Sequence, residues 1–285
     1  MISAFCPAHI TCFFDPVRSH DILRSGSKGA GIRLRNGTTV HTDEIIGSTR
    51  VMINGVEDTA EVTRHVLSIL APGRNFEVDV HCDLPMGQGF GMSASGAVAA
   101  ALCAAETAGE SRAAAFSAAH SAEVICGGGL GDVAGLMHEG DVPLRVTEGL
   151  PPAGEIIDTG LEFRNMTLAV LGPKISTGEV LRDENRLKRI SAAGSTAMHD
   201  FRNGMAKGLL FGVSNRFSSD AGLRVSAVSD AIRLLECNGI SSAMCMLGNS
   251  IFIDAPVKEA KEILGNAETY STASTGEPAR IIRTG

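Results

Sequence analysis

The stretch from Asp83 to Gly96 reads D-L-P-M-G-Q-G-F-G-M-S-A-S-G and decides the fold. Before it, Asn75 to Cys82 alternates apolar with polar residues, which is the pattern of a half-buried strand. After it, Ala94 to Ala108 is rich in alanine, which favours a helix. The order is therefore strand, glycine loop, helix. The alternate glycines let backbone N–H groups turn inward at the positive end of the helix dipole, an arrangement that binds anions, usually phosphate.

The composition is that of a folded protein without a nucleic-acid or membrane partner. The chain has 285 residues, is 44% hydrophobic and carries a net charge of −7, with its basic residues scattered. It contains no long apolar run and no tryptophan. Its seven cysteines lack paired spacings, which predicts reduced thiols and no zinc site. We therefore expect a cytoplasmic protein.

In the first half, Ile2 to Ile10 predicts a short strand with a bend at Pro7. Ser25 to Gly31 is a second glycine-rich segment, either a ligand-binding loop or a tight turn between strands. Asn54-Gly55 between apolar flanks indicates a hairpin. The Pro/Gly-rich stretch from Gly149 to Gly154 favours a domain boundary, so we predict domains at residues 1–154 and 155–285.

The second half has a different element order. Met166 to Leu171 predicts a buried strand, several helices follow, and Ala243 to Asp254 predicts a hairpin. A helix over Val257 to Leu264 and a strand over Glu268 to Thr272 complete the pattern. Strand, helices, two strands, helix and strand is the order of a ferredoxin-like α+β domain.

The glycine loop is neither a Walker P-loop nor a Rossmann fingerprint, because G-x-x-x-x-G-K-[ST] is absent and Ser93 stands where a dinucleotide loop needs glycine. A hydroxyl there can coordinate Mg²⁺ or bind a phosphate oxygen. The alternative is a plain helix N-cap.

Within this loop, the stretch from Pro85 to Ala94 matches the signature P-x-G-x-G-[LF]-G-x-S-A, and the chain thereby resembles the GHMP kinase superfamily. This resemblance implies an α+β fold of two domains, an N-terminal one like ribosomal protein S5 and a C-terminal ferredoxin-like one. It also implies ATP as phosphate donor. The implied nucleotide-binding residues are Pro85, Gly87, Gly89, Gly91, Ser93 and Ala94.

More narrowly, four motifs together resemble the archaeal pantoate kinases, a family that phosphorylates pantoate on the route to coenzyme A. These motifs are P-A-H-I-T from Pro7, G-S-K-G-A-G from Gly26, G-L-G-D-V from Gly129 and M-L-G-N from Met246. The alternatives are another kinase of this superfamily acting on a different hydroxy acid, such as homoserine, mevalonate or shikimate, and a non-catalytic nucleotide or metabolite sensor. By analogy with the family we also expect a homodimer. The apolar helices of the second half could form either the core or a dimer interface.

The resemblance places two carboxylates opposite the phosphate loop. It assigns Glu123 and Ser93 to Mg²⁺, and Asp132 to the acceptor hydroxyl as base or orienting group. Taken singly, Glu123 would more often be a solvated helix residue and Asp132 a turn former. Their joint position after a phosphate loop reverses that preference.

The resemblance also suggests where an acid substrate binds. Ser27, His120, Arg145 and Thr177 are the candidates for its carboxylate and hydroxyl groups. The alternatives are a satisfied helix histidine for His120, a surface ion pair for Arg145 and an N-cap for Thr177.

The chain departs from the family pattern in three places. Many relatives carry lysine where this chain has His9, and Lys28 is a candidate to replace that positive charge. Met92 replaces the first serine of the usual G-S-S-A. The family's C-terminal glycine motif is reduced to Leu247-Gly248-Asn249-Ser250, which leaves open whether it closes over the phosphates.

Overall fold

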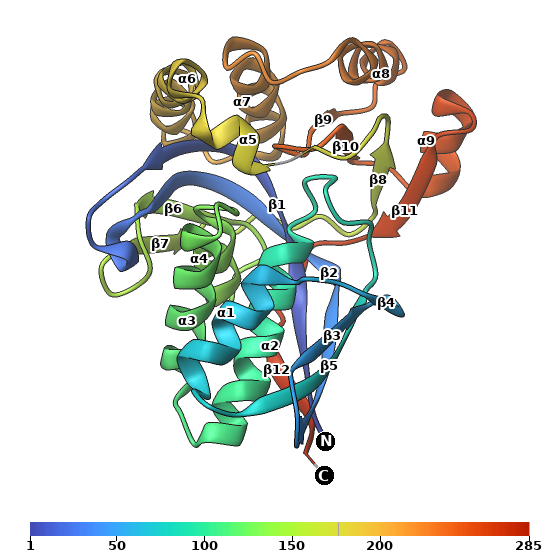
Figure 1. The fold of residues 1–285 in the computed structure, drawn as a ribbon. Helices are drawn as coiled ribbons and strands as arrows, with labels where there is room; N and C mark the ends of the chain where they lie inside the picture. The colour runs from blue at the N-terminus through green and yellow to red at the C-terminus, as the bar shows by residue number, and fades with distance from the viewer. Residues whose placement is uncertain (176, 285) are drawn as a thin grey trace.

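The computed structural model describes residues 1–175 and 177–284, without the side chains of 177, 179, 181 and 284. One sheet has the strand order β12-β1-β2-β5-β3-β4 (Figure 1). The strands along this path are β1 (Ile2–Val17), β2 (Gly26–Ile45), β3 (Arg50–Ile53), β4 (Val56–Glu57), β5 (Asn75–Cys82) and β12 (Arg280–Thr284). Two more strands, β6 (Pro143–Thr147) and β7 (Glu155–Asp158), join the same sheet through the pairing of β6 with β2. Helices on one side of it are α1 (Glu61–Leu70), α2 (Met92–Ala108), α3 (Arg112–Ile125) and α4 (Asp132–Met137).

A second sheet has the strand order β11-β8-β10-β9. In sequence order this is 4-1-3-2, so the predicted ferredoxin-like arrangement is confirmed. Its strands are β8 (Met166–Val170), β9 (Ser242–Met244), β10 (Ser250–Ile253) and β11 (Glu268–Thr272). The helices of this half are α5 (Thr177–Arg182), α6 (Glu184–Arg202), α7 (Lys207–Asp220), α8 (Ser226–Cys237) and α9 (Val257–Leu264).

The long ribbon of β1 and β2 differs from the sequence prediction. β1 does not end after Ile10, because a register shift between Pro7 and Ala8 absorbs the proline and pairing with β2 continues to Val17. The predicted glycine loop from Ser25 to Gly31 is instead the start of β2, which follows a short 3-10 helix (Ile22–Arg24). Glycine is needed there for close packing, since a Cβ on Gly29 would lie 2.2 Å from the carbonyl oxygen of Phe13.

β1 takes part in two hydrophobic cores. Ala4 and Cys6 pack in the core under α1, α2 and α3. Farther along the strand, Phe13 and Phe14 pack in the core formed with α6, α7 and the second sheet. Their rings make edge contacts with Phe201 at 5.5 Å and with Phe217 at 5.4 Å, so one strand joins the two halves.

The chain crosses between the two halves more than once. β6 (Pro143–Thr147) pairs with β2 and with β7 (Glu155–Asp158). β7 lies beyond the expected boundary at residue 154 but belongs to the first sheet. β12 returns from the second half and pairs with β1, which brings the two chain ends together in Figure 1. A division at 1–154 and 155–285 stays a prediction.

None of the helices in the described part of the chain has both the length and the apolar character needed to cross a membrane.

The contact between α6 and β1 predicts opposite effects for two helical glycines. A Cβ on Gly194 in α6 would lie 2.2 Å from the carbonyl oxygen of Phe14, whereas a Cβ on Gly212 in α7 would meet nothing within 4 Å. Gly194→Ala should lower the free energy of unfolding by about 1–3 kcal/mol through overpacking. Gly212→Ala should raise it by up to about 1 kcal/mol through helix propensity. Urea denaturation measures both, and equal effects would contradict the close packing of α6 on β1.

Candidate active site

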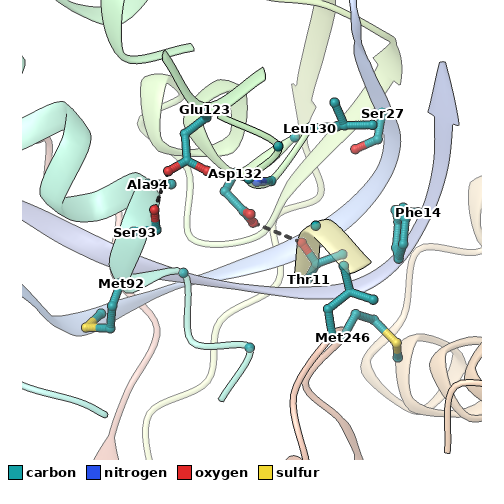
Figure 2. A pocket seen from close by; sticks show the side chains of 18 of the residues that line it. Thr11, Phe14, Ser27, Met92, Ser93, Ala94, Glu123, Leu130, Asp132 and Met246 are labelled. Atoms are coloured by element: carbon teal, nitrogen blue, oxygen red, sulfur yellow. Dashed lines mark hydrogen bonds between the residues drawn. The ribbon is translucent and has the colours of Figure 1, made fainter. Parts of the chain in front are cut away.

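One cavity of about 350 Å³ lies where α2, the turn between α3 and α4, β1 and the turn between β9 and β10 meet (Figure 2). It gathers segments far apart in sequence. The lining residues include Thr11, Phe14, Ser27, Gly87, Gly89, Gly91, Ser93, Ala94, Glu123, Leu130, Asp132, Arg182 and Met246.

The glycine loop forms one wall of this cavity. Gly87, Gly89 and Gly91 all have left-handed backbone conformations, with φ of 76°, 73° and 67°. A Cβ on Gly91 would lie 2.3 Å from the carbonyl oxygen of His9, so β1 touches the loop directly. Gly91 is the N-cap of α2, and the first N–H groups of that helix are free to bind an anion. Pro85 does not line the cavity.

Ser93 and Glu123 form a hydroxyl–carboxylate pair. The hydroxyl of Ser93 donates to Oε1 of Glu123 at 2.5 Å, and the backbone N–H of Gly129 donates to Oε2 at 2.8 Å. Ser93 is not a plain helix N-cap, because the N-cap of α2 is Gly91. Glu123 is not a solvated helix residue, because it is only 1% exposed. Burial raises the pKa of Glu123 to about 7, although the hydrogen bonds from Ser93 and Gly129 oppose this rise.

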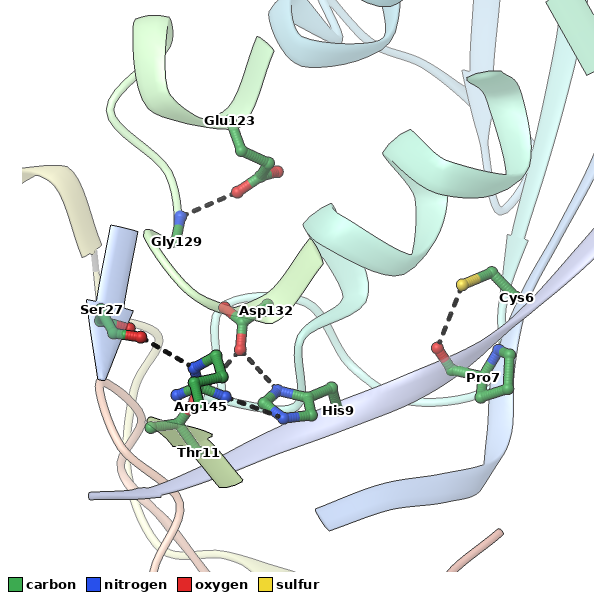
Figure 3. A network of polar contacts seen from close by, with 9 residues as sticks. All are labelled: Cys6, Pro7, His9, Thr11, Ser27, Glu123, Gly129, Asp132 and Arg145. Carbon is green, nitrogen blue, oxygen red and sulfur yellow. Dashed lines mark hydrogen bonds and ion pairs between the residues drawn. The ribbon is translucent and has the colours of Figure 1, made fainter. Parts of the chain in front are cut away.

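Asp132 lies across the cavity in a different electrostatic environment. Its Oδ1 accepts from Nδ1 of His9 at 2.7 Å and from the hydroxyl of Thr11 at 3.1 Å (Figure 3). Burial alone would raise the pKa of Asp132, but the hydrogen bond from His9, the charge of Arg145 and the Thr11 hydroxyl outweigh it and lower that pKa. Asp132 is therefore ionised at neutral pH, and its side chain is 21% exposed.

The predicted substrate-binding residues fall in different places. Ser27 lines the cavity. Arg145 and His120 are each 1% exposed and lie behind the lining. The Nε2 atom of His120 lies 2.9 Å from the carbonyl oxygen of Ser25, as in a satisfied helix histidine. The side chain of Thr177 lies outside the described part of the structure. No substrate contact of these residues is tested, and all four assignments stay predictions.

Sequence reasoning overlooked several lining residues. Thr11 ends the P-A-H-I-T motif but received no role, and Arg182 lies in none of the quoted motifs, because their positions at the cavity depend on the pairing of β1 and on the packing of α5. Lys28, expected to replace the family's lysine, instead forms an ion pair with Asp15 at 3.2 Å.

The Leu247-Gly248-Asn249-Ser250 turn packs against the phosphate loop at the edge of the cavity. A Cβ on Gly248 would lie 2.1 Å from the carbonyl group of Gln88, and the Ser250 hydroxyl donates to that carbonyl oxygen at 2.5 Å. The turn therefore holds the loop in place through backbone contact.

The oxygen donors facing the cavity suit a hard cation only in part. Ser93 and Glu123 supply a hydroxyl and a carboxylate, and the described residues contain no cluster of three or more His, Cys, Asp or Glu side chains. A cation held here would therefore take its remaining ligands from water or from a bound phosphate, as Mg²⁺ commonly does in proteins.

The raised pKa of Glu123 predicts a pH-dependent stability. Because this pKa rises from 4.5 to about 7 in the folded protein, the stabilisation is complete below pH 4.5 and is lost as pH rises through 7. Between pH 5 and pH 8 the wild-type protein should lose free energy of unfolding as Glu123 ionises, whereas glutamine at this position does not titrate. The free energy of unfolding of Glu123→Gln should therefore rise relative to that of the wild type over this pH range, by up to about 3 kcal/mol. Urea denaturation at both values measures this change, with surface-exposed Glu110→Gln as control. A gain that does not change with pH would contradict the buried, proton-binding carboxylate.

Comparison with known proteins identifies the family of the chain. Residues 54–140 match the family model for the N-terminal domain of GHMP kinases. The chain is 34% identical to the pantoate kinase of Thermococcus kodakarensis, with 93% of this chain and 92% of that protein aligned. It is 29% identical to the pantoate kinase of Methanospirillum hungatei, over 99% of this chain and 96% of that protein.

Solved structures give the same result. A phosphotransferase related to the coenzyme A biosynthesis pathway superposes with a TM-score of 0.87 at 30% identity, over 98% of both chains. A putative homoserine kinase from Listeria monocytogenes shares the fold, with a TM-score of 0.65 at 16% identity over the full length of both chains. The expected two-part α+β architecture is thereby confirmed. The chain belongs to the GHMP kinase family, in the branch that contains the archaeal pantoate kinases.

Proposed function

We propose that this protein transfers the γ-phosphoryl group of ATP to the primary hydroxyl of (R)-pantoate, giving 4-phosphopantoate for coenzyme A biosynthesis. One observation carries the proposal: a phosphate-binding loop at a helix start shares a single cavity with the Ser93–Glu123 pair and with ionised Asp132. The 34% identity to a pantoate kinase over nearly the whole chain supports the choice of acceptor.

The nucleotide's phosphates would lie against Gly87, Gly89 and Gly91, which line the cavity just before the start of α2. A neighbouring cavity of about 280 Å³ shares Val62, Met92, Ser93 and Cys126 with the first one, and apolar side chains of Ile53, Val80 and Met86 line it. We assign the base to this second cavity, since it continues directly from the start of α2.

Mg²⁺ would be held by Ser93 and Glu123 together with phosphate oxygens. When bound there, the ion neutralises charge that develops on the transferred group. Asp132 faces the space between the phosphates and the acceptor, and as a carboxylate it accepts a hydrogen bond from the attacking hydroxyl. Because its pKa is low, orientation of the hydroxyl is its main role, and the proton moves late in the transfer.

The acceptor would occupy the end of the cavity near Ser27 and Phe14. Arg182 is the only basic residue among the described residues of the lining, and its guanidinium lies over the turn at Gly127. We assign Arg182 to the carboxylate of the acceptor and Phe14 to its methyl groups. The expected contacts of His120, Arg145 and Thr177 with the acceptor stay predictions.

Two further expectations stay predictions, the cytoplasmic location and the homodimer. The sensor hypothesis finds little support, because such a protein could lose the carboxylates and this chain retains both in one cavity.

The acceptor assignment predicts a distinct substrate profile. In a coupled assay of ADP release, pantoate should give a kcat/KM at least about 10²-fold above homoserine, mevalonate or shikimate, because a site that pairs each polar group of its substrate rejects analogues lacking them. The Glu123→Gln protein is the background control. ADP release with another acid but not with pantoate would refute the acceptor and leave the kinase assignment intact.

The division of roles between Asp132 and Ser93 predicts different kinetic defects. Asp132→Asn keeps the shape and should lower kcat by about 10²–10⁴-fold with little change in KM for Mg-ATP. Ser93→Ala should mainly raise KM for Mg-ATP. Steady-state kinetics with varied Mg-ATP at saturating pantoate separates the two effects. Equal and mild losses in both variants would count against these roles.

A further inference from the structure

We infer that Arg145 and His9 are positioning residues for Asp132: Arg145 donates to Nε2 of a neutral His9, and His9 donates from Nδ1 to the carboxylate. The inference rests on the proposed function, because it concerns the residues behind the group that orients the acceptor hydroxyl. It gives Arg145 a role other than contact with the acceptor.

The direction of these hydrogen bonds follows from the donors available. A guanidinium group can only donate, and Nη1 of Arg145 lies 3.5 Å from Nε2 of His9, so Nε2 must accept (Figure 3). The proton of neutral His9 is then on Nδ1, which lies 2.7 Å from Oδ1 of Asp132. The contact with Arg145 is long and the contact with Asp132 is short, so the carboxylate is the main partner of the ring.

Burial and charge agree with a neutral His9. The ring is 0% exposed, and burial lowers its pKa; the charges of Arg145 and of Arg33 on β2 act in the same direction, while Asp132 opposes them. Asp132 also interacts electrostatically with Glu123 on α3. At neutral pH the negative charge thus stays on Asp132, which is stabilised by the donor on His9 and the cation of Arg145.

Two glycines hold the His9 ring in place. A Cβ on Gly31 of β2 would lie 2.2 Å from Nε2 of His9, and a Cβ on Gly135 of α4 would lie 2.7 Å from the same atom. The ring therefore fills the space between two stretches of bare backbone. Because it cannot turn away, it fixes both the position and the hydrogen bonding of Asp132.

Arg145 is separated from the cavity by backbone. A Cβ on Gly131 would lie 2.7 Å from Nε of Arg145, so the turn before Asp132 covers the guanidinium. Its Nε donates to the carbonyl oxygen of Ser27 at 3.0 Å, and its Nη2 has no partner among the described residues. Arg182, by contrast, lines the cavity. These two arginines therefore provide a matched comparison.

The kinetic test uses His9→Asn, His9→Leu, Arg145→Met and Arg182→Met. Asparagine and leucine have nearly the same shape, but only asparagine can supply a donor where Nδ1 lies. His9→Leu should lower kcat by about 10²-fold and move the acid limb of the kcat–pH profile up by about 1 pH unit, and His9→Asn should restore most of both. Arg145→Met should move the limb in the same direction, with KM for pantoate within about 2-fold of wild type.

The coupling between Arg145 and His9 has its own signature. In a His9→Asn background, Arg145→Met should add much less than it does in wild type, because the acceptor of its hydrogen bond is gone. Arg182→Met should raise KM for pantoate and leave the acid limb in place. If Arg145→Met behaves like Arg182→Met, Arg145 contacts the acceptor and the inference fails.

A second measurement needs no activity. ¹⁵N NMR of histidine-labelled wild-type protein at pH 7 should show one neutral imidazole protonated on Nδ1, whose signals vanish in His9→Asn. An imidazolium, or a proton on Nε2, would overturn the inference. A wild-type protein that shows the expected tautomer but does not phosphorylate pantoate would refute only the proposed function. If circular dichroism shows that a variant does not fold, the wild-type NMR spectrum still tests the tautomer and charge of His9.

Discussion

The architecture depends on β1, a single strand that belongs to two hydrophobic cores. Its first residues pack under the helices of the first sheet, and Phe13 and Phe14 pack against α6 and α7. A strand buried at both ends cannot slide by one residue without turning its apolar side chains to the wrong face. The polar residues between these ends, His9 and Thr11, are therefore held firmly beside Asp132.

The two carboxylates of the cavity are shifted in opposite directions by their surroundings. Glu123 is buried with a hydroxyl and a backbone N–H as donors, and burial prevails, so its pKa rises to about 7. Asp132 has His9, Thr11 and the charge of Arg145, and these prevail over burial and lower its pKa. Such opposed shifts are typical of sites in which two carboxylates have different tasks. A cation bound beside Glu123 would stabilise its ionised form, which burial disfavours. Asp132 is ionised at neutral pH without a cation.

Glycine lets the backbone approach the functional groups closely. A Cβ on Gly128 would lie 2.2 Å from Oε2 of Glu123, and one on Gly129 would lie 2.2 Å from Oδ2 of Asp132. The G-G-G-L-G-D turn thus wraps around both carboxylates. It limits the motion of both side chains.

The sequence by itself determined the elements whose information is local. The phosphate loop, its flanking strand and helix, the Asn54-Gly55 hairpin and the ferredoxin-like order all follow from periodicity and turn residues within short windows. Ser93 and Asp132 were found because a contiguous motif carries each of them, and Glu123 was found through the family resemblance. Tertiary structure alone decided that a glycine-rich segment is a strand, since Gly29 and Gly31 are required by contacts with β1 and not by a turn. It also decided that His9 and Asp132, 123 residues apart, share a hydrogen bond, and that Arg145 lies behind the cavity rather than in it. The physical reason is that strand pairing and burial join residues whose separation along the chain leaves no local pattern to read.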